Sequence, residues 1–352
     1  MEGEILTESK GPSSSRSQQS EATGIEGKKG GVSKERQAEG KSESSSTIQR
    51  KPIRIVVEGT ISSAVLLADG QQSVSGDKNG KIRRWRVEDG EEIGTPIDAE
   101  SSVRCLATSQ DGKWIAAGTE SGRVTVWDTE SRKELRRFAR EKAVNSVDIS
   151  SDGTKIAIAW DGFVNVSSLP DGKQLHGRKN CDYHTVKLSP DGLLFAIGVQ
   201  SSKSSFLQVV NIQNNDNVSK IRISTRSVAW ASDSKQLFAL SSDGDIHCVE
   251  VSSRKTLSKW SIHSQDNPTC ITLSSNNAFI AASANSSVSF WGTSTHEQIG
   301  FVIHYPHSVD SITISQNYDL LVGGSSGITL WDLHGVLSTP YIDGEVGRSL
   351  LP

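Results

Sequence analysis

The feature of this sequence that most constrains its fold is a short turn motif that returns about every 41 residues along most of the chain. In its clearest form the motif reads Ser, any residue, Asp, Gly, as at Ser109–Gly112. Measured at its Asp or Asn, successive copies are 42, 41, 39, 42, 43 and 41 residues apart. The copies are centred on Asp69, Asp111, Asp152, Asp191, Asp233, Asn276 and Asn317. Although 352 residues would suit two domains, this period predicts one repeat architecture.

Each copy contains the signals of four short strands. Residues 144–149 alternate between apolar and polar side chains, as a strand with one buried face does. An Asp-Gly turn follows, and then an almost entirely apolar second strand such as residues 114–118. A third strand such as residues 123–128 and a more polar fourth strand such as residues 133–140 complete the unit, because polar residues suit an exposed edge. Seven such units predict an all-β, seven-bladed β-propeller.

The ends of the third strands carry a family resemblance. Trp127-Asp128 and Trp331-Asp332 match the dipeptide that names the WD40 β-propeller family, which residues 51–334 resemble. The repeats are degenerate, because the Gly-His pair that the family places ahead of the turn motif is missing from every unit. In the remaining units the Trp stands alone or is replaced by Val, at Trp85, Trp291, Val166, Val210 and Val249. The Ser-x-Asp-Gly style resembles the large sets of WD40 proteins found in fungi.

The two ends of the sequence differ from the repeats. Residues 1–50 hold 11 Ser and 7 Gly, no aromatic residue, and 8 basic against 8 acidic residues, which predicts a disordered arm. The seven units have only six fourth strands between them. We therefore expect the β-branched segment Ile53–Val57 to serve as the missing strand and to close the ring of residues 51–334. Residues 335–352 are interpreted as a short C-terminal tail.

Composition narrows the classes of protein to which the chain could belong. A net charge of −3, from 38 Lys and Arg against 41 Asp and Glu, argues against a dedicated nucleic-acid binder. No apolar stretch approaches the roughly 20 residues of a membrane span, and the first residues lack the pattern of a signal peptide. Four cysteines without a CxxC pair predict neither a disulfide framework nor a zinc site. We expect a cytoplasmic protein, with a nuclear location as the alternative, that is monomeric on its own.

Two short motifs could suggest chemistry. Residues 323–327 match the Gly-x-Ser-x-Gly nucleophile elbow, but that elbow joins a strand to a helix and this segment is predicted to join two strands. His304 and His307 have a spacing that a metal could use, but a zinc site needs three or four ligands. The sequence therefore predicts no catalytic residue, no cofactor and no metal.

What remains is a surface for partners. In WD40 relatives, partners commonly bind the face formed by the loops from fourth to first strands and the turns from second to third strands. The resemblance thus implies a non-enzymatic scaffold that binds a protein or peptide there. The candidate contacts are Arg140, Lys142, Trp160, Asp161, Tyr183, His304, Tyr305 and His307. Trp160 carries the most weight because Trp and Arg dominate interface hot spots, with packing between blades as its alternative role. The alternative functions are a propeller-based hydrolase or lyase, and a propeller that binds an anionic ligand or nucleic acid.

Overall fold

The computed structural model describes residues 52–55, 59–67, 69–179, 181–200, 204–262, 267–325 and 327–342. The chain divides into two units, Met1–Ser46 and Thr47–Pro352, and every described residue belongs to the second. The predicted disordered arm, residues 1–50, lies outside the described residues.

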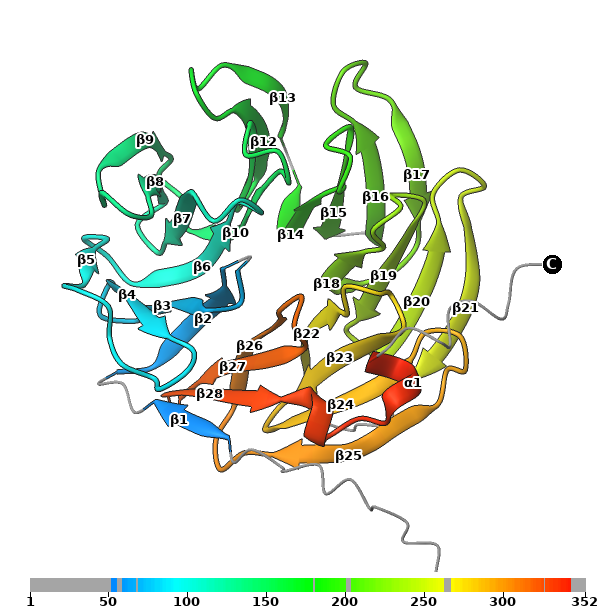
Figure 1. Cartoon of the computed structure of the whole chain (residues 1–352). Coiled ribbons are helices and arrows are strands. Elements are labelled where there is room, and N and C mark those ends of the chain that lie inside the picture. Colours follow the sequence, from blue (N-terminus) through cyan, green and yellow to red (C-terminus); the bar gives the residue numbers. More distant parts are fainter. Residues whose placement is uncertain are drawn as a thin grey trace, which may run out of the picture. The chain divides into compact units, whose positions relative to one another are not determined.

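The described residues form seven four-stranded antiparallel sheets, arranged as blades around a ring (Figure 1). Blade 1 contains β2 (Ile61–Leu66), β3 (Gln72–Asp77), β4 (Lys81–Arg86) and β5 (Ile97–Asp98). Blade 2 contains β6 (Val103–Thr108), β7 (Trp114–Thr119), β8 (Arg123–Asp128) and β9 (Glu134–Ala139). Blade 3 contains β10 (Val144–Ile149), β11 (Lys155–Trp160), β12 (Phe163–Ser168) and β13 (Gln174–Lys179). Blade 4 contains β14 (Asp182–Leu188), β15 (Leu194–Gln200), β16 (Ser205–Asn211) and β17 (Asn217–Ile221).

The remaining blades follow in chain order. Blade 5 contains β18 (Thr225–Trp230), β19 (Gln236–Ser241), β20 (Asp245–Glu250) and β21 (Lys255–Ser261). Blade 6 contains β22 (Pro268–Leu273), β23 (Phe279–Ala284), β24 (Ser287–Gly292) and β25 (Gln298–His304). Blade 7 contains β26 (Val309–Ile314), β27 (Asp319–Gly324), β28 (Gly327–Asp332) and β1 (Ile53–Ile55). A 3₁₀ turn, η1 (Leu333–Gly335), and a short helix, α1 (Thr339–Ile342), come after β28.

This arrangement confirms the predicted all-β, seven-bladed propeller. Blade 7 takes its outermost strand from the other end of the sequence. β1 pairs antiparallel with β28, so that Ile53 lies opposite Leu330 and Ile55 opposite Ile328. Blade 7 thus has four strands like the others. Val56 and Val57, which were included in the predicted strand, lie outside the described residues.

The repeated turn motif is a compact hydrogen-bonded unit. In blade 2 the carboxylate of Asp111 accepts hydrogen bonds from the Ser109 hydroxyl, at 2.5 Å, and from the Lys113 amide, at 3.0 Å. The Ser109 hydroxyl in turn accepts the amide of Trp114, at 2.9 Å, where the second strand begins. Gly112 adopts a φ of +70°, which glycine reaches without strain. The motif therefore fixes the start of each second strand, and so the register of each blade.

A ring of small polar residues joins the innermost strands of neighbouring blades. The Ser146 hydroxyl accepts the amide of Val186 in the next blade at 3.2 Å, and Ser311 bonds both the amide and the carbonyl of Ala64, at 3.1 and 2.9 Å. Each member of the ring stands six residues before the Asp or Asn of its turn motif. The members are Ser63, Cys105, Ser146, Thr185, Ser227, Cys270 and Ser311. Two of the four free cysteines thus occupy serine positions, and burial raises the pKa of the Cys105 thiol to about 12.

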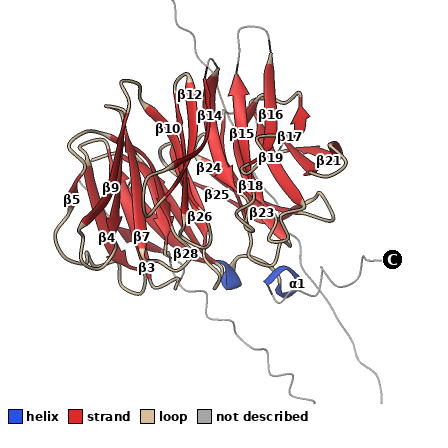
Figure 2. Cartoon of the chain, turned by 90° about the horizontal axis from the view of Figure 1, so that it is seen from above, coloured by secondary structure: helices blue, strands red, loops and turns tan. Residues whose placement is uncertain are grey.

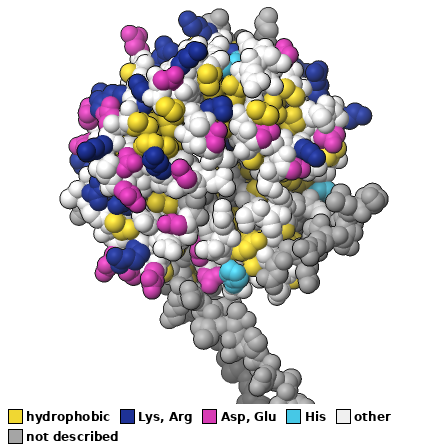
Figure 3. Space-filling model, turned by 45° about the horizontal axis from the view of Figure 1, so that its top comes forward, with side chains coloured by type: hydrophobic (Ala, Val, Ile, Leu, Met, Phe, Trp, Pro, Cys, Tyr) yellow, Lys and Arg dark blue, Asp and Glu magenta, His cyan; other side chains and the backbone are white. Residues whose placement is uncertain are grey.

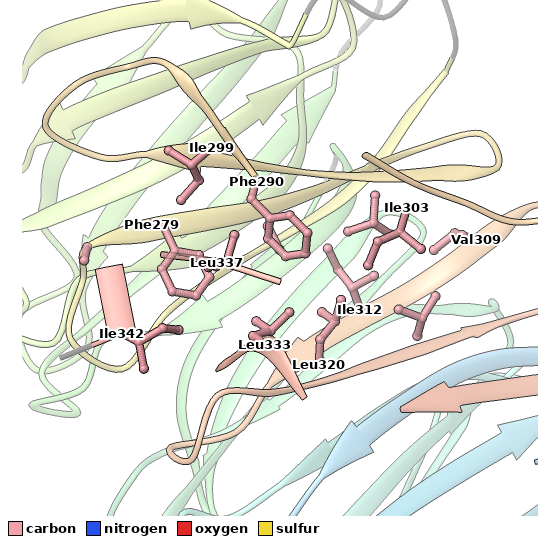
Figure 4. Packing of buried hydrophobic residues seen from close by; sticks show 14 residues of the cluster. Phe279, Phe290, Ile299, Ile303, Val309, Ile312, Leu320, Leu333, Leu337 and Ile342 are labelled. Carbon is pink, nitrogen blue, oxygen red and sulfur yellow. The ribbon is translucent and has the colours of Figure 1, made fainter. Parts of the chain in front are cut away.

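Apolar side chains fill the spaces between blades. Figure 4 shows the cluster between blades 6 and 7, in which Phe279 and Phe290 are fully buried beside Val309 and Leu320. The segment after β28 joins this cluster through Leu333, Leu337 and Ile342, which are all buried in it. The last two belong to the predicted C-terminal tail, residues 335–352. The side chain of Asn276 also donates to the carbonyl of Tyr341 at 2.8 Å, so α1 is held against blade 6.

The positions that carry the WD resemblance lie in the core. Trp85, Trp127 and Trp291 are buried, as are Val166, Val210 and Val249, whereas Trp331 is only partly buried. Charged side chains of both signs are interspersed on the surface seen in Figure 3, and hydrophobic side chains form small separate patches there. Among the described residues, no helix has the length and apolar character needed to cross a membrane.

Candidate functional site

The candidate contacts gather at one face of the propeller. The loops from the outer strand of one blade to the inner strand of the next, and the turns from second to third strands, share the face opposite α1. Figure 2 shows α1 at the lower edge, so this loop face is at the upper edge. The structure divides the eight candidates into two groups. One lies over blades 2 to 4 and the other between blades 6 and 7.

The first group surrounds a hollow of about 480 Å³ between blades 2 and 3, here called hollow A. It brings together Arg140, Lys142, Trp160 and Asp161 from the sequence-based candidates. Its other lining residues are Ala139, Glu141, Gly162, Phe163 and Lys179. Four of the eight candidates, separated by up to 21 positions in the sequence, therefore line one concave site.

Trp160 forms the floor of hollow A and is not an exposed contact. It is only 1% exposed, and its indole nitrogen donates to the carbonyl of Gly122 in blade 2 at 3.0 Å. The equivalent residues at the ends of other second strands include Asp77 and Thr119, whose side chains bond the following turn. Blade 3 has a large aromatic ring at this position instead. The ring packs between the blades, which is the alternative role that the sequence left open.

Arg140 is the exposed residue that this floor positions. Its guanidinium lies 4.4 Å from the ring centre of Phe163 and 5.6 Å from that of Trp160. Such cation–π contacts hold a long side chain in place and leave its hydrogen-bond donors free to meet a partner. Among the described residues, no carboxylate lies within ion-pair distance of Arg140. Hollow A therefore presents a pre-positioned cation above a rigid aromatic base.

Tyr183 is also buried, at 2% exposure, and burial raises the pKa of its hydroxyl to about 12. It lines a second hollow between blades 3 and 4, which shares Lys179 with hollow A. Its backbone carbonyl accepts a hydrogen bond from Asn145 at 3.0 Å, and the same amide group donates to Asp161 at 2.6 Å. Tyr183 is therefore buried below the loop face, and its backbone carbonyl holds Asn145 there.

The second group of candidates lies between blades 6 and 7, away from hollow A. His304 and His307 are exposed. Tyr305 is partly buried, and its hydroxyl accepts a hydrogen bond from the indole of Trp331 at 2.8 Å. Burial raises the pKa of this hydroxyl. Tyr305 therefore links the loop to the core of blade 7, and only the two histidines remain as exposed candidates of this group.

A further set of residues, not predicted from the sequence, lies at the loop-face end of the inner strands. Every inner strand has a register shift within its first three paired positions, which leaves one residue bulged. The bulged residues are Ser62, Arg104, Asn145, His184, Arg226, Thr269 and Asp310. All seven stand seven residues before the Asp or Asn of the turn motif, a spacing that could have revealed them. Bulges commonly re-aim side chains at functional sites.

Three of the bulged residues bond the residue 16 positions later in their own blade. Arg104 pairs with Glu120 at 3.1 Å, and His184 contacts Gln200. In blade 3 the partner of Asn145 is Asp161, a residue of hollow A. The bulges of blades 2 to 4 thus organise the loop face around the candidate site.

The two motifs that could suggest chemistry have other roles in the structure. Residues 323–327 connect β27 to β28 directly, so they form a strand-to-strand turn, as expected. Ser325, the Ser of the motif, lies in this turn, and its hydroxyl is 3.1 Å from the hydroxyl of Ser308. No group of three or more His, Cys, Asp or Glu side chains that could hold a metal gathers among the residues that the structure describes.

Comparisons with known proteins agree with the fold. The family model for the WD domain, G-beta repeat, matches residues 90–128 and 254–292. Both matches end at the residue after a third-strand Trp, in blades 2 and 6. A 100-residue segment covering 28% of the chain is 34% identical to the mouse (Mus musculus) NACHT domain- and WD repeat-containing protein 1.

Two other relatives match similar lengths of the chain. A Serine-threonine kinase receptor-associated protein of Dictyostelium discoideum is 30% identical over 124 residues, 33% of the chain. The Small ribosomal subunit protein RACK1z of Arabidopsis thaliana is 31% identical over 125 residues, 32% of the chain. The chain covers 6% of the mouse relative, 40% of the Dictyostelium protein and 38% of the Arabidopsis protein.

The fold and the loop face define a seven-bladed propeller of the repeat-protein class. The turn motifs, the third-strand Trp residues and the two family matches identify the chain more narrowly. It carries WD40 repeats in the two segments that the family model matches, and it is similar to WD repeat proteins.

Proposed function

We propose that this protein is a non-enzymatic interaction scaffold that holds a protein partner on the loop face, over hollow A. The observation that carries the proposal is the seating of Arg140 above Phe163 and Trp160. A cation that is already positioned loses little side-chain freedom on binding, and Arg is among the residues enriched at interface hot spots. Two of the relatives have names that refer to association with a kinase receptor and with a ribosomal subunit.

The proposed mechanism is rigid presentation. The floor of hollow A is fixed by the Trp160–Gly122 hydrogen bond, and its rim by the Asn145 side chain, which bonds both Asp161 and the backbone of Tyr183. A partner would therefore meet a surface that is ordered before binding. Arg140, Lys142 and Asp161 are the proposed contacts. Trp160 and Tyr183 support them, and His304 and His307 remain as a separate, peripheral pair.

The proposed setting is inside the cell, in the cytoplasm, with the nucleus as the alternative. The four cysteines of the chain are all free thiols, which suits a reducing compartment. We propose a protein rather than a nucleic acid as the partner because the net charge is −3.

The test is affinity capture from cells followed by mass spectrometry, with three forms of the protein. The double variant Arg140→Glu with Lys142→Glu reverses two charges at hollow A. It should capture at least ten-fold less partner than the wild type. The control is Lys113→Glu, because Lys113 makes a comparable cation–π contact, 4.8 Å from the ring centre of Trp114, at the opposite face. It should capture as the wild type does. Equal capture by the double variant, with an unchanged melting temperature, would exclude hollow A as the main site.

A further inference from the structure

A second concave site adjoins hollow A and differs from it in charge. It is a groove of about 620 Å³ between blades 3 and 4, here called the blade 3–4 groove. One wall comes from the end of β13 and the residues after it, and the other from β15, β16 and β17. Its cations are Arg178, Lys179 and Lys220. The other lining residues are Cys181, Tyr183, Val199, Phe206, Gln208, Asn215 and Asn217.

No carboxylate lines the groove among the described residues. Arg178, Lys179 and Lys220 also form no ion pair with any residue that the structure describes. Blade 2, by contrast, has three of its arginines in ion pairs, Arg104–Glu120, Arg123–Glu100 and Arg137–Glu134. The groove therefore concentrates positive charge that the protein itself does not compensate. Asp182 and Asp216 are the nearest acids in sequence, and neither lines it.

Two of the three cations are held at the groove by contacts that leave their charge available. The Arg178 guanidinium donates to the backbone carbonyl of Asn215 at 3.3 Å, which links blade 3 to blade 4. The Lys220 ammonium lies 4.0 Å from the ring centre of Phe206. Neither contact supplies a negative charge. The cations are thus positioned for an external anion, which lowers the ordering cost of binding one.

The arrangement of the cations indicates the kind of anion. Arg178 and Lys179 are neighbours on one strand, so their side chains leave it on opposite sides, and Lys220 belongs to another blade. Cations spread in this way match several separate carboxylates along a peptide chain. They match a single phosphate group less well, because all of its oxygens are bonded to one phosphorus atom. Three cations are also few for a nucleic-acid duplex, whose binders make roughly 6–10 phosphate contacts.

We propose that the blade 3–4 groove binds an acidic peptide segment, rich in Asp and Glu, of the partner that the loop face holds. This inference rests on the proposed function, because Lys179 lines both sites and makes the groove continuous with hollow A. The partner's segment leaves hollow A past Lys179 and extends outward between the blades. Electrostatic complementarity of this kind sets specificity and the association rate.

The experiment measures fluorescence anisotropy of labelled eight-residue peptides with the purified full-length chain. An alternating Glu-Ser peptide should bind, with an affinity that falls as salt is raised, and a Gln-Ser peptide of equal length should not. The double variant Arg178→Gln with Lys220→Gln should lower the affinity for the acidic peptide at least ten-fold. The double variant Lys113→Gln with Lys133→Gln removes the same charge at the opposite face and should change the affinity less than two-fold.

A second variant separates the loss of charge from the loss of the hydrogen bond between Arg178 and Asn215. Lys220→Gln alone leaves the Arg178–Asn215 link intact and should still weaken binding at least three-fold. Equal affinity for the acidic and neutral peptides, equal binding by the Arg178→Gln/Lys220→Gln protein, or no binding of the acidic peptide to the wild type would each overturn the proposal. So would tighter binding of a single-phosphoserine peptide, a single-stranded RNA or phosphatidylserine vesicles at the same residues.

The two proposals fail separately. If the acidic peptide does not bind but the Arg140→Glu/Lys142→Glu protein loses its partner, the groove proposal is wrong and the scaffold proposal stands. If the peptide binds the groove while capture is indifferent to Arg140 and Lys142, the position proposed for the partner is wrong.

Discussion

Two boundaries between blades differ in the side chains that line them: the one between blades 6 and 7, and the one between blades 3 and 4. The first is filled by aliphatic and aromatic side chains, including Phe290, and is covered by residues from the segment after β28 (Figure 4). The second also has a buried apolar cluster, but it adds the blade 3–4 groove and a buried histidine, His176, beside Phe195. Repeats with the same strand order can therefore specialise, because one boundary is closed by apolar residues and the other also carries an open polar groove.

The largest expected effect breaks the apolar boundary. Phe290 is fully buried in blade 6, so Phe290→Ala should lower the free energy of unfolding by about 3–5 kcal/mol. The matched control is Phe301→Ala in the same blade, where the side chain is 48% exposed, and it should cost less than about 0.5 kcal/mol. Urea unfolding followed by tryptophan fluorescence measures both. Similar losses for the two variants would show that this cluster does not hold the boundary.

A smaller effect should appear at the polar boundary in acid. Burial, with a contribution from nearby Arg178, lowers the pKa of His176 to about 4. The unfolded chain, with a histidine pKa near 6.5, then binds more protons than the folded chain between pH 6.5 and 4, so stability falls as pH falls through this window. The expected loss attributable to His176 is on the order of 2 kcal/mol.

His176→Phe tests this because it keeps a ring against Phe195 and cannot titrate. Its unfolding free energy should decline less between pH 6.5 and 4 than that of the wild type. The control, His304→Gln, removes an exposed histidine, and its unfolding free energy should decline as that of the wild type does. If His176→Phe and the wild type lose stability in parallel, acid sensitivity does not arise at this boundary.

The smallest effects should be similar at the blade 3–4 boundary and at the boundary between blades 7 and 1, because serines at equivalent positions link the inner strands at both. Ser146→Ala removes the link from blade 3 to blade 4, and Ser311→Ala the link from blade 7 to blade 1. Each should cost about 1 kcal/mol, the usual net value of one buried hydrogen bond. Cys105→Ser should cost less than about 0.5 kcal/mol, since serine is the ring's common residue. A cost confined to one serine would show that the links are not equivalent.

Much of the fold could be predicted from the sequence because the period of the turn motif is set by local chemistry. Asp-Gly turns and alternating strands depend only on neighbouring residues, so they can be recognised in the sequence without knowledge of any tertiary contact. Trp160 was harder, because its burial depends on a carbonyl of another blade, that of Gly122. The packing of Leu337 and Ile342 similarly depends on a surface of blade 6 that no local pattern shows.

The candidate site was predictable only in part, for a related reason. Arg140, Lys142 and Asp161 could be assigned to the loop face from strand order alone, and the structure places them around one hollow. The blade 3–4 groove could not be found in this way, because its cations come from strands of two different blades and its overall charge is invisible in a chain of net charge −3. The bulged residues were accessible in principle, since they keep a constant distance from the turn motif.

Because β1 pairs with β28, closure of the ring does not depend on which connection between strands is left open. Because residues near both ends of the propeller share one sheet, a linker from Ile342 back to Pro52 would leave every strand pairing in place. The chain could then be opened at another loop, such as the one between β15 and β16. A circular permutant of this kind would carry a fused domain on the loop face, beside the blade 3–4 groove, and would keep every residue of hollow A in the chain.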